Sequence, residues 1–207
     1  MKLRLGFLAS HGGSSMQAIY AAIQAGQLQA QAQVVISNNS QSDALAFARA
    51  VALPAYHLSV KTEQTAEQLD SRMRDLLLDH EVQLVILSGY MKKLGPQTLS
   101  TYKDRILNIH PALLPKYGGQ GMYGEHVHAA VLAAGESETG ITIHTIDEHY
   151  DQGKILAQCR MLIYPEDTPQ SLAFRVKARE RSFFVEALRQ LTEQGGSQVL
   201  LYDGFKS

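Results

Sequence analysis

The chain has 207 residues, enough for one sizeable α/β domain, with the 45% hydrophobic and 19% charged content of a globular enzyme. A formal net charge of -1 gives no basis for a nucleic-acid or membrane-surface partner. Cys159 is the only cysteine, which excludes an internal disulfide and a thiolate metal cluster. No segment reaches the ~20 consecutive apolar residues of a membrane span. The first residues read as a strand rather than a secretion signal, so we expect a cytoplasmic protein.

The chain begins with a predicted strand over residues 3–9, a serine- and glycine-rich turn over 10–15, and a helix. The helix is predicted by Met16, Ile19 and Ile23, which recur at helical spacing. Such a loop can present backbone N–H groups and the positive end of a helix dipole to an anion, although many similar loops serve packing alone. It matches neither G-x-G-x-x-G nor a P-loop. A small phosphorylated ligand therefore fits better than a dinucleotide or ATP.

Strands and helices alternate along the rest of the chain, as in a mostly parallel sheet. We expect helices over 43–52, 65–79, 96–102 and 125–134, and a last helix from Thr168-Pro169 onward. After the first strand, we expect strands over 32–37, 54–58, 84–87, 106–110, 139–146 and 155–163, and an edge strand over 199–207. Four glycines within 118–124 predict an irregular loop that could act as a lid. Without repeats or linkers, the sequence predicts an α/β fold: a single Rossmann-like domain over 1–207, with helices flanking the sheet.

The strand over 106–110 carries two polar side chains near its end, Asn108 and His110. Side chains two apart in a strand point to the same side, and Pro111 disfavours helical geometry at His110. Ligands of parallel α/β sheets bind where the strands end. Asn108 could therefore donate a hydrogen bond to an oxyanion while His110 handles a proton. The alternative is a structural asparagine beside a core histidine.

Glu180 falls inside the apolar stripe of the last helix rather than on its polar face. The stripe consists of Leu172, Val176, Phe183, Ala187 and Leu191. An unpaired buried carboxylate is costly. We therefore expect Glu180 to meet either a neighbouring cation, Arg175 or Lys177, or the amine of a ligand.

The eight histidines invite a metal hypothesis, above all the pair in His126-Val127-His128. No H-E-x-x-H or comparable ligand set is present, and histidines on a helix surface are common. We therefore expect no metal. The absence of a G-x-S-x-G elbow argues against a serine hydrolase.

Three motifs together resemble the folate-dependent formyltransferase family. They are NIHPALLP over 108–115, TGITIH over 139–144 and DEHYDQG over 147–153. The similarity runs from residue 2 to about 192. It implies the formyltransferase fold and direct transfer of the formyl group of 10-formyltetrahydrofolate through a tetrahedral intermediate, without a metal. Because the chain is short, we expect the small members, which formylate 5'-phosphoribosylglycinamide (GAR) in purine biosynthesis; a homodimer is compatible with this.

The resemblance also assigns roles position by position. The catalytic set would be Asn108, His110 and Asp151. The acceptor GAR would contact Gly13, Ser14, Ser15, Lys177, Ala178, Arg179 and Glu180. The folate would contact Met91, Lys92, Lys93, Leu94, Asn108, Ile146, Asp147, Glu148, His149, Tyr150 and Asp151. Asp151 would raise the pKa of the His110 imidazole, and the protonated ring would stabilise the oxyanion together with Asn108. A formyltransferase for another amine and a non-catalytic phosphate-binding module are the alternatives.

Overall fold

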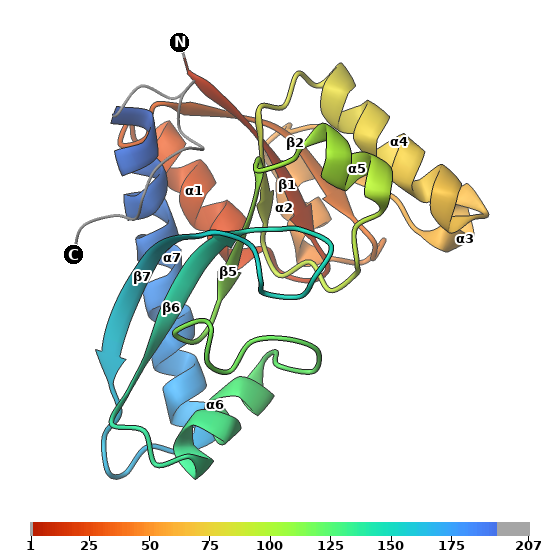
Figure 1. The fold of residues 1–207 in the computed structure, drawn as a ribbon. Helices are drawn as coiled ribbons and strands as arrows, with labels where there is room; N and C mark the ends of the chain where they lie inside the picture. The colour runs from red at the N-terminus through yellow and green to blue at the C-terminus, as the bar shows by residue number, and fades with distance from the viewer. Residues whose placement is uncertain (1, 194–207) are drawn as a thin grey trace.

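The computed structural model describes residues 2–193, which form a seven-stranded sheet with helices on both faces (Figure 1). The strands are β1 (Leu3–Ala9), β2 (Ala30–Ser37), β3 (Ala55–His57), β4 (Leu84–Leu87), β5 (Ile106–His110), β6 (Glu138–Thr145) and β7 (Ile155–Leu162). They lie in the order β3-β2-β1-β4-β5-β6-β7. The first five strands pair in parallel, whereas β6 and β7 pair antiparallel. The expected α/β sheet, mostly parallel and flanked by helices, is confirmed.

Seven helices connect or follow these strands within the described residues. They are α1 (Ser14–Gln24), α2 (Asp43–Ala50), α3 (Val60–Glu63), α4 (Ala66–Asp79), α5 (Pro96–Thr101), α6 (Glu125–Ala133) and α7 (Pro169–Glu193). The helix α3 is not among those expected from the sequence; it is a single turn closed by a reciprocal cap between Ser59 and Thr62. Thr65 caps α4 rather than belonging to it. The edge strand expected over 199–207 lies outside the described residues.

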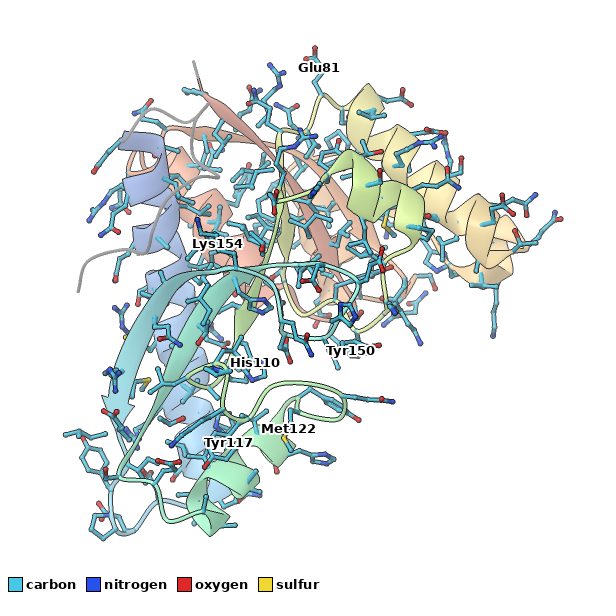
Figure 2. The ribbon with its side chains drawn as sticks, viewed as in Figure 1. Glu81, His110, Tyr117, Met122, Tyr150 and Lys154 are labelled. Carbon is cyan, nitrogen blue, oxygen red and sulfur yellow. The ribbon has the colours of Figure 1, made fainter. Side chains whose placement is uncertain are left out.

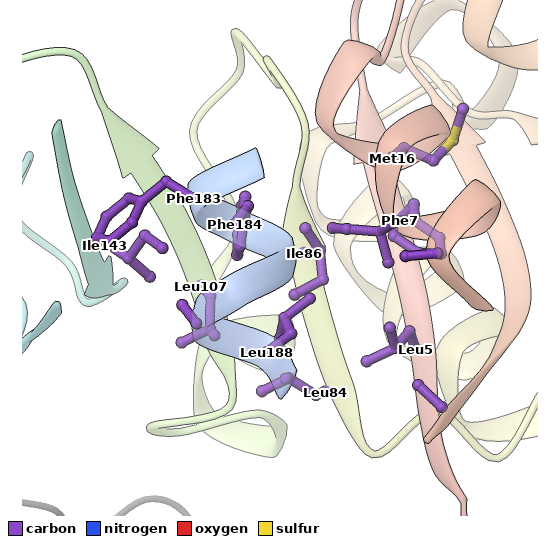
Figure 3. Packing of buried hydrophobic residues seen from close by; sticks show 14 of the residues in the cluster. Leu5, Phe7, Met16, Leu84, Ile86, Leu107, Ile143, Phe183, Phe184 and Leu188 are labelled. Atoms are coloured by element: carbon purple, nitrogen blue, oxygen red, sulfur yellow. The ribbon is translucent and has the colours of Figure 1, made fainter. Parts of the chain in front are cut away.

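Alternating side chains of the buried strands divide the core into two layers, one on each face of the sheet. On β1, Leu5 and Phe7 pack toward α1, α2 and α7, while Leu8 packs toward α4. Figure 3 shows the first layer, in which Phe184 of α7 lies among side chains of the central strands. Fully burying one such side chain contributes about 1.5–3 kcal/mol. The two layers therefore hold the strand ends in fixed positions.

A buried carboxylate anchors the segment that follows β4. Asp70 of α4 accepts hydrogen bonds from the backbone N–H of Gln97 (2.7 Å) and Thr98 (2.9 Å) and from Thr98 Oγ1 (2.6 Å). It thereby satisfies N–H groups at the start of α5, which have no partner within the helix. This fixes the stretch between β4 and α5. Over residues 2–193, no helix combines the length and apolar character needed to cross a membrane.

Candidate active site

A cavity of about 850 Å³ opens where β1, β4 and β5 end. Its wall combines the first turn of α1, the segments after β4 and β5, the glycine-rich loop over 119–124, the β6–β7 loop and one face of α7. The strand order reverses between β1 and β4. In open α/β sheets, the crevice at such a reversal is where ligands bind.

The structure brings Asn108, His110 and Asp151 together in this wall. His110 Nδ1 lies 3.5 Å from Asp151 Oδ2, an ion contact longer than a good hydrogen bond. Asn108 Nδ2 lies 3.3 Å from His144 Nε2, and that nitrogen lies 3.6 Å from Asp151 Oδ1. His144 is a fourth member of the cluster. Figure 2 shows His110 near Tyr117 and Met122.

Backbone carbonyls define which nitrogen of each histidine carries a proton. His110 Nε2 donates to the Tyr117 carbonyl (2.8 Å), and His144 Nδ1 donates to the Thr145 carbonyl (2.9 Å). Because a carbonyl oxygen can only accept, the neutral rings are left with free lone pairs on His110 Nδ1 and His144 Nε2. The amide of Asn108 therefore donates one hydrogen to His144, and its second hydrogen has no partner among the described residues.

Burial lowers the pKa of His110 below its ordinary value, although the Asp151 carboxylate and the bond to the Tyr117 carbonyl act in the opposite direction. The expectation that Asp151 raises this pKa is correct for the carboxylate's own contribution and wrong for the net shift. His110 is therefore neutral at pH 7, and the expected protonated ring is a wrong prediction for the free protein. Burial also lowers the pKa of His144.

Two glycines allow the loops around Asp151 to approach closely enough. A Cβ atom on Gly153 would lie 1.8 Å from the Thr145 carbonyl oxygen, so only glycine fits this side of the β6–β7 loop. A Cβ on Gly118 would lie 2.5 Å from Leu114 Cδ2 and 3.1 Å from Asp151 Cβ. The backbone N–H of Gly119 donates to Asp151 Oδ2 at 2.9 Å. The Asp151 carboxylate is thus held between the β6–β7 loop that carries it and the segment at Gly118 and Gly119.

The first turn of α1 forms the end of the cavity best suited to an anion. Gly13, Ser14 and Ser15 line it, and Met16 N donates to Ser88 Oγ at 3.0 Å. N–H groups of a first helical turn have no acceptor within the helix and sit at the positive end of its dipole. Lys177 of α7 lines the same cavity. The arrangement fits a phosphate group.

Glu180 lines the cavity, and burial raises its pKa to about 7, against the opposing influence of Lys177 and Arg181. Neither cation expected to pair with it does so: Arg175 pairs with Asp167, and the ion pairs found within residues 2–193 do not include Glu180. The expected internal ion pair is therefore not formed. The role toward a ligand amine stays a prediction.

The remaining residues expected at the acceptor lie elsewhere. Ala178 and Arg179 are not part of the cavity wall. The Arg179 guanidinium makes two hydrogen bonds of 2.7 Å with the Glu186 carboxylate instead. The residues of this helix that line the cavity are Ala173, Val176, Lys177 and Glu180, which share one helical face.

The residues expected at the folate separate into three groups. Met91, Lys92, Asn108, Tyr150 and Asp151 line the 850 Å³ cavity. Lys93 and Leu94 instead line a neighbouring cavity of about 860 Å³ beside α4, whose wall shares Tyr90 and Lys92 with the first. Ile146 packs against the core, and the exposed residues Asp147, Glu148 and His149 line neither cavity.

Two histidines of the site carry no role in the sequence analysis. His144 stands directly opposite Asn108 in the β5–β6 register, so correct strand pairing would have found it. His128 lines the cavity with its Nδ1 buried and without a hydrogen-bond partner, although its place on a helix suggested a surface position. The described residues contain no group of three or more side chains able to hold a metal ion.

A family model described as formyl transferase matches residues 3–188. The chain belongs to this family. It is 36% identical over 191 residues to the chloroplastic phosphoribosylglycinamide formyltransferase of Vigna unguiculata, covering 92% of this chain and 61% of that protein. It is 32% identical over 190 residues to the phosphoribosylglycinamide formyltransferase of Haemophilus influenzae, covering 92% and 87%.

Solved structures agree with this assignment. The phosphoribosylglycinamide formyltransferase of Coxiella burnetii, in complex with CHES, is 34% identical with a TM-score of 0.85, covering 94% of this chain and 89% of that one. The enzyme of the same name from Bacillus halodurans is 30% identical with a TM-score of 0.85, covering 96% and 100%. The fold is thus the formyltransferase fold.

Proposed function

We propose that the protein transfers the formyl group of 10-formyltetrahydrofolate to the amine of GAR, a step of purine biosynthesis. The observation that carries this proposal is one cavity that is lined by the N-terminus of α1, a carboxylate without an ion pair among residues 2–193, and the Asn108–His110–Asp151 cluster. These features match the three parts of the reaction: a phosphate, an amine and a carbonyl carbon that develops negative charge. The names of the relatives support GAR as the acceptor.

The two substrates would enter from different sides of the cluster. The phosphate of GAR would bind at Gly13, Ser14 and Ser15, with Lys177 nearby. Its amine would reach Glu180. The folate would lie against the segment after β4, at Met91 and Lys92, and against the loop that carries Asp151. The formyl carbon of the folate would then lie beside the cluster, within reach of the GAR amine.

The neutral imidazole of His110 defines the proton path in this proposal. The amine nitrogen attacks the formyl carbon, and the free N–H of Asn108 donates to the oxyanion. His110 Nδ1 accepts the proton released by the amine, and Asp151 stabilises the resulting imidazolium. His110 then returns the proton to N10 of the folate as the bond between this nitrogen and the formyl carbon breaks. Tetrahydrofolate and formylated GAR are released, and atoms and charge balance.

The decisive experiment measures formyl transfer from 10-formyltetrahydrofolate to GAR by the purified protein and by His110→Ala. We expect saturable turnover by the wild type and a loss of about 10²–10⁴ in kcat for the variant, the usual contribution of a general base. Turnover with another amine but not with GAR would replace the acceptor in the proposal. Absence of saturable binding of a folate analogue would favour the non-catalytic module.

Three further statements stay predictions: a cytoplasmic location, a homodimer and a single domain over residues 1–207. Three relatives are named chloroplastic, and this chain spans 61%, 66% and 63% of their lengths. Fractionation of the source cells and sedimentation of the purified chain test the first two. Limited proteolysis tests the third.

A further inference from the structure

One short segment contacts both His110 and Asp151. The carbonyl of Tyr117 accepts from His110 Nε2 at 2.8 Å, and two residues later the N–H of Gly119 donates to Asp151 Oδ2 at 2.9 Å. The Tyr117 backbone has φ 57°, a left-handed conformation that tyrosine rarely adopts. Something outside the segment must stabilise this conformation.

Glu136, in the turn between α6 and β6, supplies that contact. Its Oε1 accepts from Tyr117 Oη at 2.8 Å and from Lys116 Nζ at 2.8 Å. These two donors lower the pKa of the Glu136 carboxyl, so that it is ionised at neutral pH. Lys116, Tyr117 and Glu136 lie outside the wall of the substrate cavity. We refer to these three residues as the clamp.

We propose that Glu136 is a positioning residue for the catalytic histidine: through the clamp it holds the Tyr117 carbonyl where it keeps His110 in the Nε2–H tautomer. This inference rests on the proposed function only for its effect on turnover. The tautomer itself is a property of the free protein.

The clamp is needed because the surroundings of His110 favour the wrong tautomer. The Asp151 carboxylate faces Nδ1 at 3.5 Å and would attract a proton onto that nitrogen. With Nδ1–H formed, the lone pair of His110 lies on Nε2, beside the Tyr117 carbonyl, so Nδ1 cannot accept the proton of the amine and catalysis through it stops. The other titratable groups that act on His110 are His128 and His144, both of which burial keeps neutral. Among the described residues, the Tyr117 carbonyl is therefore the group that opposes Asp151.

The test records ¹⁵N NMR spectra of histidine-labelled, full-length protein without substrates, because imidazole ¹⁵N shifts distinguish the two tautomers. We compare the wild type with Glu136→Ala and Tyr117→Phe, which remove the clamp from opposite ends. Glu136→Gln is the conservative rescue, since its amide oxygen still accepts both hydrogen bonds. Glu138→Gln is the matched control, because it breaks a surface ion pair with Arg160 on the neighbouring strand.

We expect the wild type and Glu138→Gln to show the Nε2–H form of His110, and Glu136→Ala and Tyr117→Phe to gain the Nδ1–H form. In formyl transfer, the latter two should lose about tenfold in kcat with KM for both substrates unchanged, the typical effect of one hydrogen bond to a charged group. Glu136→Gln should restore most of the rate. Thermal melting checks that each variant is folded. If Glu136→Ala does not fold, Tyr117→Phe replaces it, because this substitution keeps the aromatic ring in place.

An unchanged tautomer in both folded clamp variants overturns the proposal, whatever happens to turnover. A loss of stability or rate without a tautomer change would give the clamp a merely structural role and also overturn it. If the wild type does not formylate GAR, the proposed function fails while the NMR comparison still decides the clamp. The two failures are thus distinguishable.

Discussion

Replacing Glu180 should raise the stability of the free protein and weaken its interaction with GAR. Burial raises the pKa of Glu180 from 4.5 to about 7. Above pH 7 the folded protein must hold a carboxylate that would ionise more easily in the unfolded chain. At about 1.4 kcal/mol for each unit of pKa, this destabilises the free protein by up to about 3 kcal/mol. The sign is the reverse of that for an ion-paired acid: the penalty is absent below pH 4.5, grows between 4.5 and 7, and is complete above.

We therefore expect Glu180→Gln to stabilise the free protein at pH 8 by up to about 3 kcal/mol, with no gain at pH 4.5. The same variant should raise KM for GAR, because the amine loses its carboxylate partner. Urea unfolding at a series of pH values measures the first effect and initial rates measure the second. Glu186→Gln is the control on the same helix: its carboxyl is paired with Arg179, which lowers its pKa, so the substitution should destabilise at neutral pH. A stability difference for Glu180→Gln that does not vary with pH would refute the reasoning.

Three further substitutions test the cluster. Asp151→Asn should lower kcat about 100-fold with little change in KM. Because the carboxylate raises the pKa of His110, its loss should also move the acid limb of the kcat–pH profile to lower pH. An unshifted limb would contradict the assigned contact between Asp151 and His110. His144→Phe removes the acceptor that orients Asn108 and should cost about tenfold in kcat, so a wild-type rate would exclude this role. Gly118→Ala places a methyl group 2.5 Å from Leu114 Cδ2 and should lower both the melting temperature and kcat. Differential scanning calorimetry and the formyl-transfer assay measure the two effects. A melting temperature and kcat equal to those of the wild type would mean that the loop can shift freely.

The strands and most helices are predictable because their patterns are local. The apolar runs over 3–9 and 84–87 appear as β1 and β4 with identical bounds. The Thr168-Pro169 signal marks the start of α7, where Thr168 Oγ1 accepts from Ser171 N at 3.1 Å. In contrast, α3 has no buried residue and is only four residues long, so no hydrophobic periodicity predicts it. The available signal was the pair of polar residues that cap it, Ser59 and Thr62.

The site is less predictable because it depends on distances between chain segments. The spacing of Asn108 and His110 indicated a common side of β5, but nothing local joined them to Asp151, which only the resemblance brought in. The net pKa of His110 also required the structure, since a nearby carboxylate and burial act in opposite directions and sequence shows neither magnitude. For Asp147, Glu148 and His149, motif membership did not imply a place in the cavity wall.

Two polar features of this cavity lack their best partner in the free protein. Glu180 has no cation among residues 2–193, and the N–H groups of Ser14 and Ser15 at the start of α1 have no acceptor within the helix. Both would gain that partner from a ligand that carries a phosphate and an amine. A ligand that supplies these partners should therefore bind and stabilise the fold at the same time. Because Glu180→Gln removes one of these penalties, GAR should raise the melting temperature of the wild type by more than that of the variant, and an equal shift in both would mean that Glu180 does not meet the amine.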